Sequence, residues 1–329
     1  MKFQPTEPFV PAPGIRGAHA QTIFASLARP TRSPPLRRER RELPDGDFVD
    51  LDTFDGPTGA PHVVVLHGLE GSSQAGYVTE VLRGAAKRGW GATAINFRSC
   101  SGEPNRLARA YHSGDTSDTL LVMADVGARI TGPMLAVGFS LGANVLCRLL
   151  EETGDAAPVM AAASISAPYD LDACCRKLDS GSGFLWFYRQ RFLRTLKSKS
   201  RAKLQRFPGA FDLKTMQAAH TIRAFDDVVT GPLHGFQGAE HYYREASSGP
   251  RLADIRRPTL LLSAADDPML EAPVIPPSAR GNPFLSVVLT EHGGHVGFVA
   301  GSLGRPSFWA ENQALVFFER VLAERPAAV

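Results

Sequence analysis

The order of apolar runs and amphipathic stretches between residues 62 and 166 places the tightest limit on the fold. Short apolar runs, as in buried strands, alternate there with stretches in which apolar residues recur at helical spacing. Strands that alternate with helices are typical of parallel sheets with crossover helices. The expected strands are His62–Leu66, Gly91–Asn96, Met134–Gly138 and Val159–Ser166, and the expected helices are Tyr77–Arg88, Thr116–Ile130 and Ala143–Glu152.

An antiparallel hairpin is expected to precede this alternation. Leu36–Leu43 and Phe48–Phe54 flank Asp45-Gly46, a dipeptide that favours a tight hairpin turn. Residues 1–35 are rich in proline and predict an irregular arm over the surface, with one short helix near Gln21–Leu27. We therefore expect an N-terminal arm at 1–35 and one domain at 36–329.

The alternation stops near residue 170, and a mostly helical stretch follows to about residue 250. Strand patterns return at Thr259–Ser263 and Phe284–Leu289, and Ser307–Ala323 is expected to form the last helix. The predicted fold class is α/β, with a mostly parallel central sheet flanked by helices. A small helical cap is inserted into this sheet at about residues 170–250.

Composition excludes several classes of protein. The chain has 329 residues, and its formal net charge of +3 gives no electrostatic reason to expect nucleic-acid binding. Its four cysteines form no CxxC pair, and no Cys/His cluster has zinc spacing. We predict no metal and no cofactor. Because the first twenty residues lack the apolar run of a signal peptide, we expect a soluble cytoplasmic protein.

The sharpest chemical signal is Gly138-Phe139-Ser140-Leu141-Gly142, between an expected strand and an expected helix. This is the context that a G-x-S-x-G nucleophile elbow requires. The serine must occupy a tight, strained turn, and side chains at the two glycine positions would clash across it. The pattern therefore predicts Ser140 as a nucleophile exposed above the sheet.

An acid and a histidine are expected to follow the serine in that order. Asp266 and Asp267 follow one late strand, and His292 and His295 follow the other, so all four side chains reach the carboxyl edge of the sheet. We select Asp267, because it leads directly out of its loop. We select His295, because the two glycines before it allow a flexible approach to the serine. His292 is interpreted as a surface histidine.

The predicted chemistry is acyl transfer through the serine. His295 accepts the Ser140 proton, Asp267 orients the imidazole ring, and the resulting acyl-enzyme is resolved by water. Two backbone N–H groups are expected to form an oxyanion hole. Leu141 supplies one, as the residue after the nucleophile, and Leu69 supplies the other from the His67–Ser73 loop after a predicted strand.

Together these residues resemble the α/β-hydrolase superfamily and, within it, the YheT-like abhydrolase branch of esterases. The resemblance implies the same triad of Ser140, Asp267 and His295. One departure is Ser99, where the branch usually carries glycine. The matching segments are Ala18–Thr22, His67–Ser72, Asn96–Asn105, Tyr111–Asp115, Gly138–Gly142, Phe225–Asp227, Gly235-Phe236, Tyr242-Tyr243, Asp266–Pro268 and His292–Phe298.

Positive charge is concentrated in the first part of the insertion. Residues 184–211 contain eight Lys and Arg residues and no acid. Leu185, Tyr188, Phe192 and Leu196 fall on one helical face. Such a helix can form a lid over an active site, can lie in a membrane interface, or can be an ordinary packed helix with a solvated basic face. In the first two cases it favours apolar acyl chains in the pocket below.

Three other motifs have simpler interpretations. Cys100 is a poor nucleophile candidate because no histidine lies at a recognisable motif distance. One acidic pair, Asp226-Asp227, falls short of a hard-cation site and is interpreted as helix capping or a salt bridge. Arg98 is expected to form an internal network with a carboxylate such as Asp115.

The sequence therefore predicts a serine hydrolase, a carboxylesterase that acts on a small-molecule ester or lipid with an apolar acyl group. Two alternatives stay open. The same triad could transfer the acyl group to an alcohol, or the fold could serve as a catalytically silent binding protein. Peripheral membrane contact through the basic cap is a further expectation, and the oligomeric state is not predicted.

Overall fold

A computed structural model describes residues 2–30 and 32–324 of the chain. An eight-stranded sheet forms its centre, in the order β1-β2-β4-β3-β5-β6-β7-β8. β1 and β2 pair antiparallel, as do β2 and β4, and the remaining neighbours are parallel. The strands are β1 (Arg37–Glu42), β2 (Phe48–Phe54), β3 (His62–Leu66), β4 (Gly91–Asn96), β5 (Met134–Phe139), β6 (Ala161–Ile165), β7 (Thr259–Ala264) and β8 (Leu285–Thr290).

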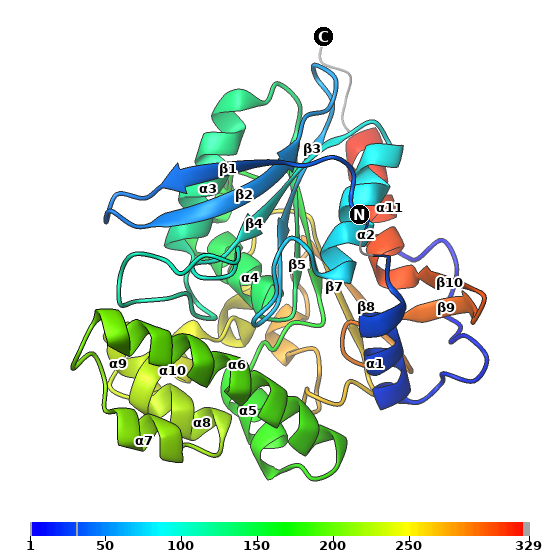
Figure 1. The fold of residues 1–329 in the computed structure, drawn as a ribbon. Coiled ribbons are helices and arrows are strands. Elements are labelled where there is room, and N and C mark those ends of the chain that lie inside the picture. Colours follow the sequence, from blue (N-terminus) through cyan, green and yellow to red (C-terminus); the bar gives the residue numbers. More distant parts are fainter. Residues whose placement is uncertain (1, 31, 325–329) are drawn as a thin grey trace.

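Helices cover both faces of this sheet (Figure 1). α2 (Gly76–Lys87) and α11 (Trp309–Ala323) pack on one face, and α3 (Ser117–Arg129) and α4 (Leu141–Thr153) pack on the other. Successive side chains of a strand point to opposite faces, so β3 needs apolar residues throughout. Its alternate residues enter separate clusters, Val65 with Leu82 and Val64 with Met123. The predicted α/β-hydrolase architecture is confirmed.

The helical insertion forms a cap beside one end of the sheet (Figure 1). It has its own apolar core, which includes Met216, Phe225 and Tyr243. A π-helical turn, Asp226–Thr230, joins α8 to α9, and a 3-10 helix, Gly249–Asp254, leads into β7. The cap helices are α5 (Leu171–Ser180), α6 (Phe184–Arg206), α7 (Leu213–Ala218), α8 (Ile222–Phe225), α9 (Gly231–Leu233) and α10 (Ala239–Ala246).

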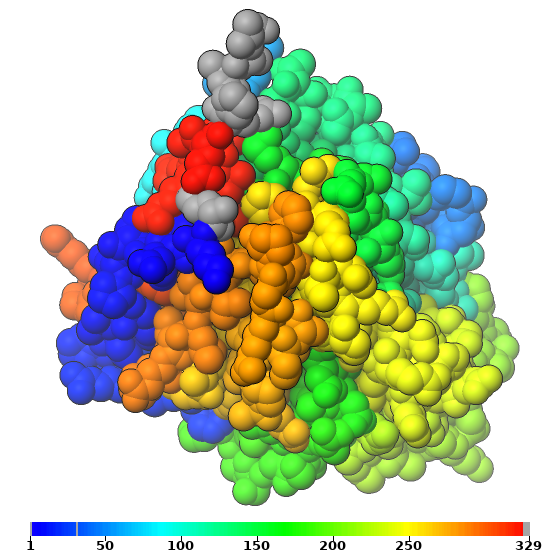
Figure 2. Space-filling view, turned by 180° about the vertical axis from the view of Figure 1, so that it is seen from behind, coloured from blue at the N-terminus to red at the C-terminus, as the bar shows by residue number. Residues whose placement is uncertain are grey.

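The N-terminal residues pack into the body of the protein. The expected short helix extends over Ala18–Ala28 as α1, and Gln21 and Ala25 on it are fully buried. Phe3 contacts Phe317 of α11 edge to face at 5.4 Å. Figure 2 shows the N-terminal segment lying against the C-terminal helix. The division into an arm, a domain and an insertion stays a prediction.

One segment differs from the sequence-based expectation. Ser307 was expected to begin the last helix, but it lies in a short hairpin of β9 (Val299–Ser302) and β10 (Arg305–Phe308), and α11 begins at Trp309. Four-residue strands are too short to show a clear alternation of apolar and polar residues. The predicted strands of the main sheet agree with β1 to β8 to within two residues at each end.

Candidate active site

Ser140 lies at the turn between β5 and α4 with φ 51° and ψ −119°, a backbone conformation that non-glycine residues rarely adopt. The glycines on either side make this turn possible. A Cβ atom on Gly138 would lie 2.4 Å from the carbonyl oxygen of Gly142. A Cβ atom on Gly142 would lie 2.4 Å from the carbonyl oxygen of His67. The elbow therefore requires glycine at both positions.

The structure brings the three residues of the predicted triad into one hydrogen-bonded row. Ser140 Oγ lies 2.9 Å from His295 Nε2, and His295 Nδ1 lies 2.8 Å from Asp267 Oδ2. Asp267 is 1% exposed, and its other oxygen accepts a hydrogen bond from the Met269 amide at 2.8 Å. Because a carboxylate can only accept, Nδ1 carries the proton, and Nε2 is left to accept from the Ser140 hydroxyl.

The alternative acid and histidine form a separate pair. His292 Nδ1 lies 3.4 Å from Asp266 Oδ2, and the His292 side chain is 44% exposed. Asp266 also accepts a hydrogen bond from the Gly294 amide at 2.9 Å. The second pair therefore stabilises the start of the His295 loop, and the structure does not bring it to Ser140.

Helix α1 holds the His295 loop in place. Thr22 Oγ1 accepts a hydrogen bond from the His295 amide at 2.9 Å. The Gln21 side chain accepts from the Val299 amide at 2.6 Å and donates to the Val299 carbonyl at 3.1 Å. Arg29 donates to the Val296 carbonyl at 2.7 Å. Sequence reasoning assigned no role to these residues, although Ala18–Thr22 was among the matching segments.

The glycines before His295 do not have the role expected of them. Flexibility was predicted, but Gly294 has φ +62° and packs closely on α1. A Cβ atom there would lie 2.3 Å from the Ala18 carbonyl oxygen, and one on Gly293 would lie 2.6 Å from the Phe298 ring. These glycines allow close packing and left-handed backbone at a fixed position.

The predicted oxyanion-hole residues both lie beside Ser140. Leu69 and Leu141 line the same pocket as the serine, and within residues 2–30 and 32–324 their N–H groups donate no hydrogen bond. Two tyrosine hydroxyls hold the peptides around Leu69. Tyr77 accepts from the Gly68 amide at 3.0 Å, and Tyr111 accepts from the Glu70 amide at 2.8 Å.

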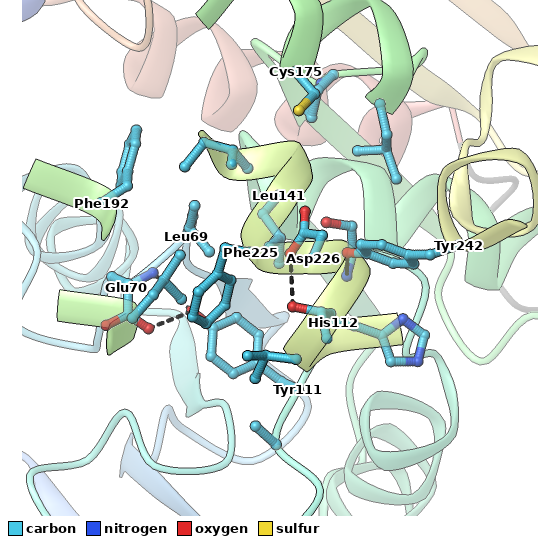
Figure 3. Close-up of a pocket in the computed structure, with 18 of the residues that line it drawn as sticks. Leu69, Glu70, Tyr111, His112, Leu141, Cys175, Phe192, Phe225, Asp226 and Tyr242 are labelled. Carbon is cyan, nitrogen blue, oxygen red and sulfur yellow. Dashed lines mark hydrogen bonds between the residues drawn. The ribbon is translucent and has the colours of Figure 1, made fainter. Parts of the chain in front are cut away.

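The cap contacts this loop through Glu70. The Lys199 ammonium group of α6 lies 3.0 Å from Glu70 Oε1. The Tyr111 hydroxyl donates to the same oxygen at 3.0 Å, as Figure 3 shows. The Glu70 side chain is only 8% exposed, so solvent weakens this ion pair less than it would weaken an exposed one. The cap is thereby connected to the backbone next to Leu69.

The pocket above Ser140 is mostly apolar. It lies between the body and the cap, and Phe192 of α6 is among its lining residues (Figure 3). Leu196, one turn further along α6, also lines it. This places α6 over the pocket, as the lid interpretation expects. Its other apolar lining residues include Leu69, Leu141, Leu171, Leu178, Ile222, Phe225, Val229, Leu233 and Met269.

Not all of the basic residues of α6 are on a solvated face. Lys199 and Lys203 both line the pocket. Lys203 donates to Asn105 Oδ1 at 2.6 Å and to the Leu107 carbonyl at 2.8 Å, and burial lowers its pKa to about 8. Lys199 and Lys203, on the inner face of α6, therefore bond to groups of the body.

The acidic pair of the cap divides into two roles. Asp227 accepts a hydrogen bond from the Ala239 amide at 3.0 Å, which is the predicted capping role at the start of α10. Asp226 instead faces the pocket and accepts from Thr230 at 2.6 Å and from Tyr243 at 2.7 Å. Burial raises the pKa of Asp226 to about 6. Within the described ranges, no group of three His, Cys, Asp or Glu residues could hold a metal.

The loop after β4 is an internal network, although one predicted partner is wrong. Arg98 pairs with Asp118 at 2.6 Å and with Asp47 at 2.9 Å, whereas Asp115 pairs with Arg109. Ser99 has φ 63°, which explains why glycine is favoured at that position. Burial raises the pKa of the neighbouring Cys100 to about 11, so its thiol is a weak nucleophile.

Comparison with known proteins identifies the family. The sequence profile described as "alpha/beta hydrolase fold" matches residues 61–302, and the chain belongs to this family. The chain is 40% identical over 318 residues to the Escherichia coli (strain K12) protein named "Putative esterase YheT". The match covers 95% of this chain and 93% of the other. The YheT-like branch inferred from the sequence motifs is thereby confirmed.

More distant relatives include a human protein named "Phospholipase ABHD3". It is 31% identical over 319 residues, which cover 93% of this chain and 77% of that protein. A Saccharomyces cerevisiae protein named "Monoacylglycerol lipase" is 31% identical and covers 84% of this chain and 63% of its own length. The Pyrococcus furiosus esterase Pf2001 has the same fold, with a TM-score of 0.54 at 15% identity, over 87% of this chain and 92% of its own.

Proposed function

We propose that this protein is a serine carboxylesterase that cleaves esters with an apolar acyl group. The observation that carries the proposal is the hydrogen-bonded row of Ser140, His295 and Asp267, at 2.9 and 2.8 Å, at the wall of an apolar pocket. A serine hydroxyl and a histidine ring nitrogen at this distance favour transfer of the hydroxyl proton to the imidazole ring.

The chemistry follows from the roles of these groups. Ser140 Oγ attacks the ester carbonyl carbon while His295 Nε2 accepts its proton, and Asp267 stabilises the imidazolium. The negative charge on the carbonyl oxygen is stabilised by the N–H groups of Leu69 and Leu141. The tetrahedral intermediate expels the alcohol, which takes the proton from His295, and water then releases the acid from Ser140 by the same steps in turn.

The substrate class follows from the pocket and the relatives. Apolar side chains from both the cap and the body line the space next to Ser140, which suits the burial of an acyl chain. The names of the relatives, a phospholipase and a monoacylglycerol lipase, support a lipid ester. We therefore propose a glycerolipid or similar ester as the substrate.

A fluorophosphonate probe tests the proposal directly. The probe should label the wild-type protein, and Ser140→Ala should abolish labelling and ester turnover without loss of folded structure. A series of chromogenic esters of increasing acyl length should show kcat/KM rising with chain length until the pocket is filled. Folded wild-type protein that is not labelled would support the silent binding protein, and ester product formed in the presence of a competing alcohol would support acyl transfer.

A further inference from the structure

The outward face of α6 carries an unusual group of exposed aromatic side chains. Phe184, Trp186 and Phe187 are 52%, 52% and 53% exposed. In the part of the chain that the structure describes, no other Phe, Tyr or Trp belongs to the exposed class. Large apolar side chains that gather on a surface mark a site of interaction, because water is a poor solvent for them.

Arginines continue the same face beyond the aromatic residues. Phe187, Arg191, Arg194, Ser198 and Arg201 are separated by four, three, four and three residues, so they form one stripe along the helix, and all five are exposed. Among the described residues, the guanidinium groups of these three arginines form no hydrogen bond or ion pair, and the one side-chain hydrogen bond to their backbone is that of Thr195 to the Arg191 carbonyl. Residues 184–211 contain no acid that could neutralise them.

We propose that this face of α6 docks the protein on a lipid bilayer that contains anionic lipid. Phe184, Trp186 and Phe187 insert among the headgroups, and the arginine stripe lies on the charged surface. Aromatic rings partition into the membrane interface, and arginine side chains are attracted to anionic headgroups. We favour a bilayer over a nucleic acid or an acidic protein because the opposite face of the same helix lines an apolar pocket that suits an acyl chain.

The position of the pocket supports a lipid as the occupant. The opposite face of the same helix contributes Phe192 and Leu196 to the pocket that contains Ser140. One helix thus separates the proposed membrane surface from the proposed ester site. None of the described helices is long and apolar enough to cross a bilayer. Docking requires no chemistry at Ser140 and so goes beyond the proposed function.

Sedimentation with vesicles tests the proposal. The Ser140→Ala protein is mixed with sucrose-loaded vesicles of phosphatidylcholine, with or without one third phosphatidylglycerol. We expect binding to the anionic vesicles that weakens as salt is added. Joint substitution of Phe184, Trp186 and Phe187 by serine should lower the partition coefficient about tenfold or more. Joint substitution of Arg191, Arg194 and Arg201 by glutamine should remove the preference for anionic vesicles.

Leu289→Ser provides the matched control. Leu289 is 51% exposed, like the three aromatic residues, but it lies on β8, and this variant should bind vesicles as the parent does. Equal binding by the triple serine variant and the parent would overturn the proposal. So would the absence of binding to anionic vesicles at low salt, even if fluorophosphonate labelling of the wild type supports the proposed esterase.

Trp186 provides a second, spectroscopic test that does not depend on removing the aromatic face. The other two tryptophans, Trp90 and Trp309, are 8% and 3% exposed. Vesicles with brominated acyl chains should therefore quench the emission of Trp186 and shift it to shorter wavelength. Trp186→Phe should keep vesicle binding but lose this quenching. Emission that is not quenched at saturating anionic lipid would contradict insertion of this face.

Discussion

The loops that present Ser140 and His295 place the two side chains 2.9 Å apart, but they are held there by different means. The Ser140 elbow depends on residues close to it in sequence, the glycines at 138 and 142. The His295 loop depends on α1, whose Thr22 precedes His295 by 273 residues. Thr22 binds the His295 amide, and Gln21 binds both polar groups of the Val299 backbone.

This difference separates two kinds of mutational effect. A substitution at Gly138 or Gly142 would displace Ser140, the proposed nucleophile, directly, because the new side chain would clash with neighbouring backbone. A change in α1 touches neither Ser140 nor the pocket floor, yet it alters the position of the base through buried hydrogen bonds, and a buried N–H without a partner costs roughly 1–3 kcal/mol. The geometry of the proposed catalytic site therefore depends on a segment that contributes none of the proposed catalytic residues.

The largest expected effect is that of replacing His295, the proposed base. His295→Ala should lower kcat/KM for a chromogenic ester by at least about 1000-fold, because among the described residues His295 is the side chain hydrogen-bonded to the Ser140 hydroxyl. His292→Ala is the control and should change it by less than about threefold, since that side chain is exposed and pairs with Asp266. The reverse ranking would contradict the choice of histidine.

Substitution in α1 should have the next largest effect. Thr22→Val keeps the shape of the side chain but leaves the His295 amide without its acceptor, so kcat should fall about 10- to 100-fold with little change in KM. Ser26→Ala removes an exposed hydroxyl from the same helix and should leave kcat unchanged. If the two variants behave alike, α1 does not position the base.

The loop that carries Leu69 should be less sensitive. Tyr111→Phe keeps the stacking on Phe97, at 5.3 Å, but removes the hydroxyl that binds the backbone and carboxylate of Glu70. We expect kcat to fall by about three- to tenfold, because the Leu69 amide is held less firmly toward the oxyanion. Tyr169→Phe, which loses a buried hydroxyl outside the pocket, should not reproduce this fall. A change confined to KM would argue against a positioning role.

A change in the cap should alter stability with a defined pH dependence. Burial raises the pKa of Asp226 to about 6, above the ordinary value near 3.8, so the folded state holds this proton more tightly than the unfolded state. The wild-type protein should therefore lose stability as pH rises from about 4 to 6. Asp226→Asn does not titrate, so its unfolding free energy relative to wild type should rise over this window by on the order of 2 kcal/mol. Urea unfolding at pH 4.5, 5.5 and 6.5 measures this difference, and a flat difference would contradict it.

Local sequence signals determined much of the architecture and of the candidate site. Short apolar runs, a hairpin turn signal and helical spacing located the eight strands of the main sheet and the four helices that flank it, because burial on both faces of a strand or on one face of a helix imposes those patterns. The elbow at Ser140 could be recognised from the sequence because its strained turn leaves no room for a side chain at positions 138 and 142. Asp267 and His295 could be proposed because each directly follows a strand whose carboxyl end reaches the same edge.

Only the tertiary structure decided the contacts between distant segments. The hydrogen bonds of Gln21 and Thr22 to the His295 loop leave no periodic trace in the sequence, because they join single residues about 273–278 positions apart. The charge of α6 was evident, but its division into Lys199 and Lys203 facing inward and an arginine stripe facing outward depends on how the helix packs. A sequence records which residues are available, and long-range packing determines which of them meet.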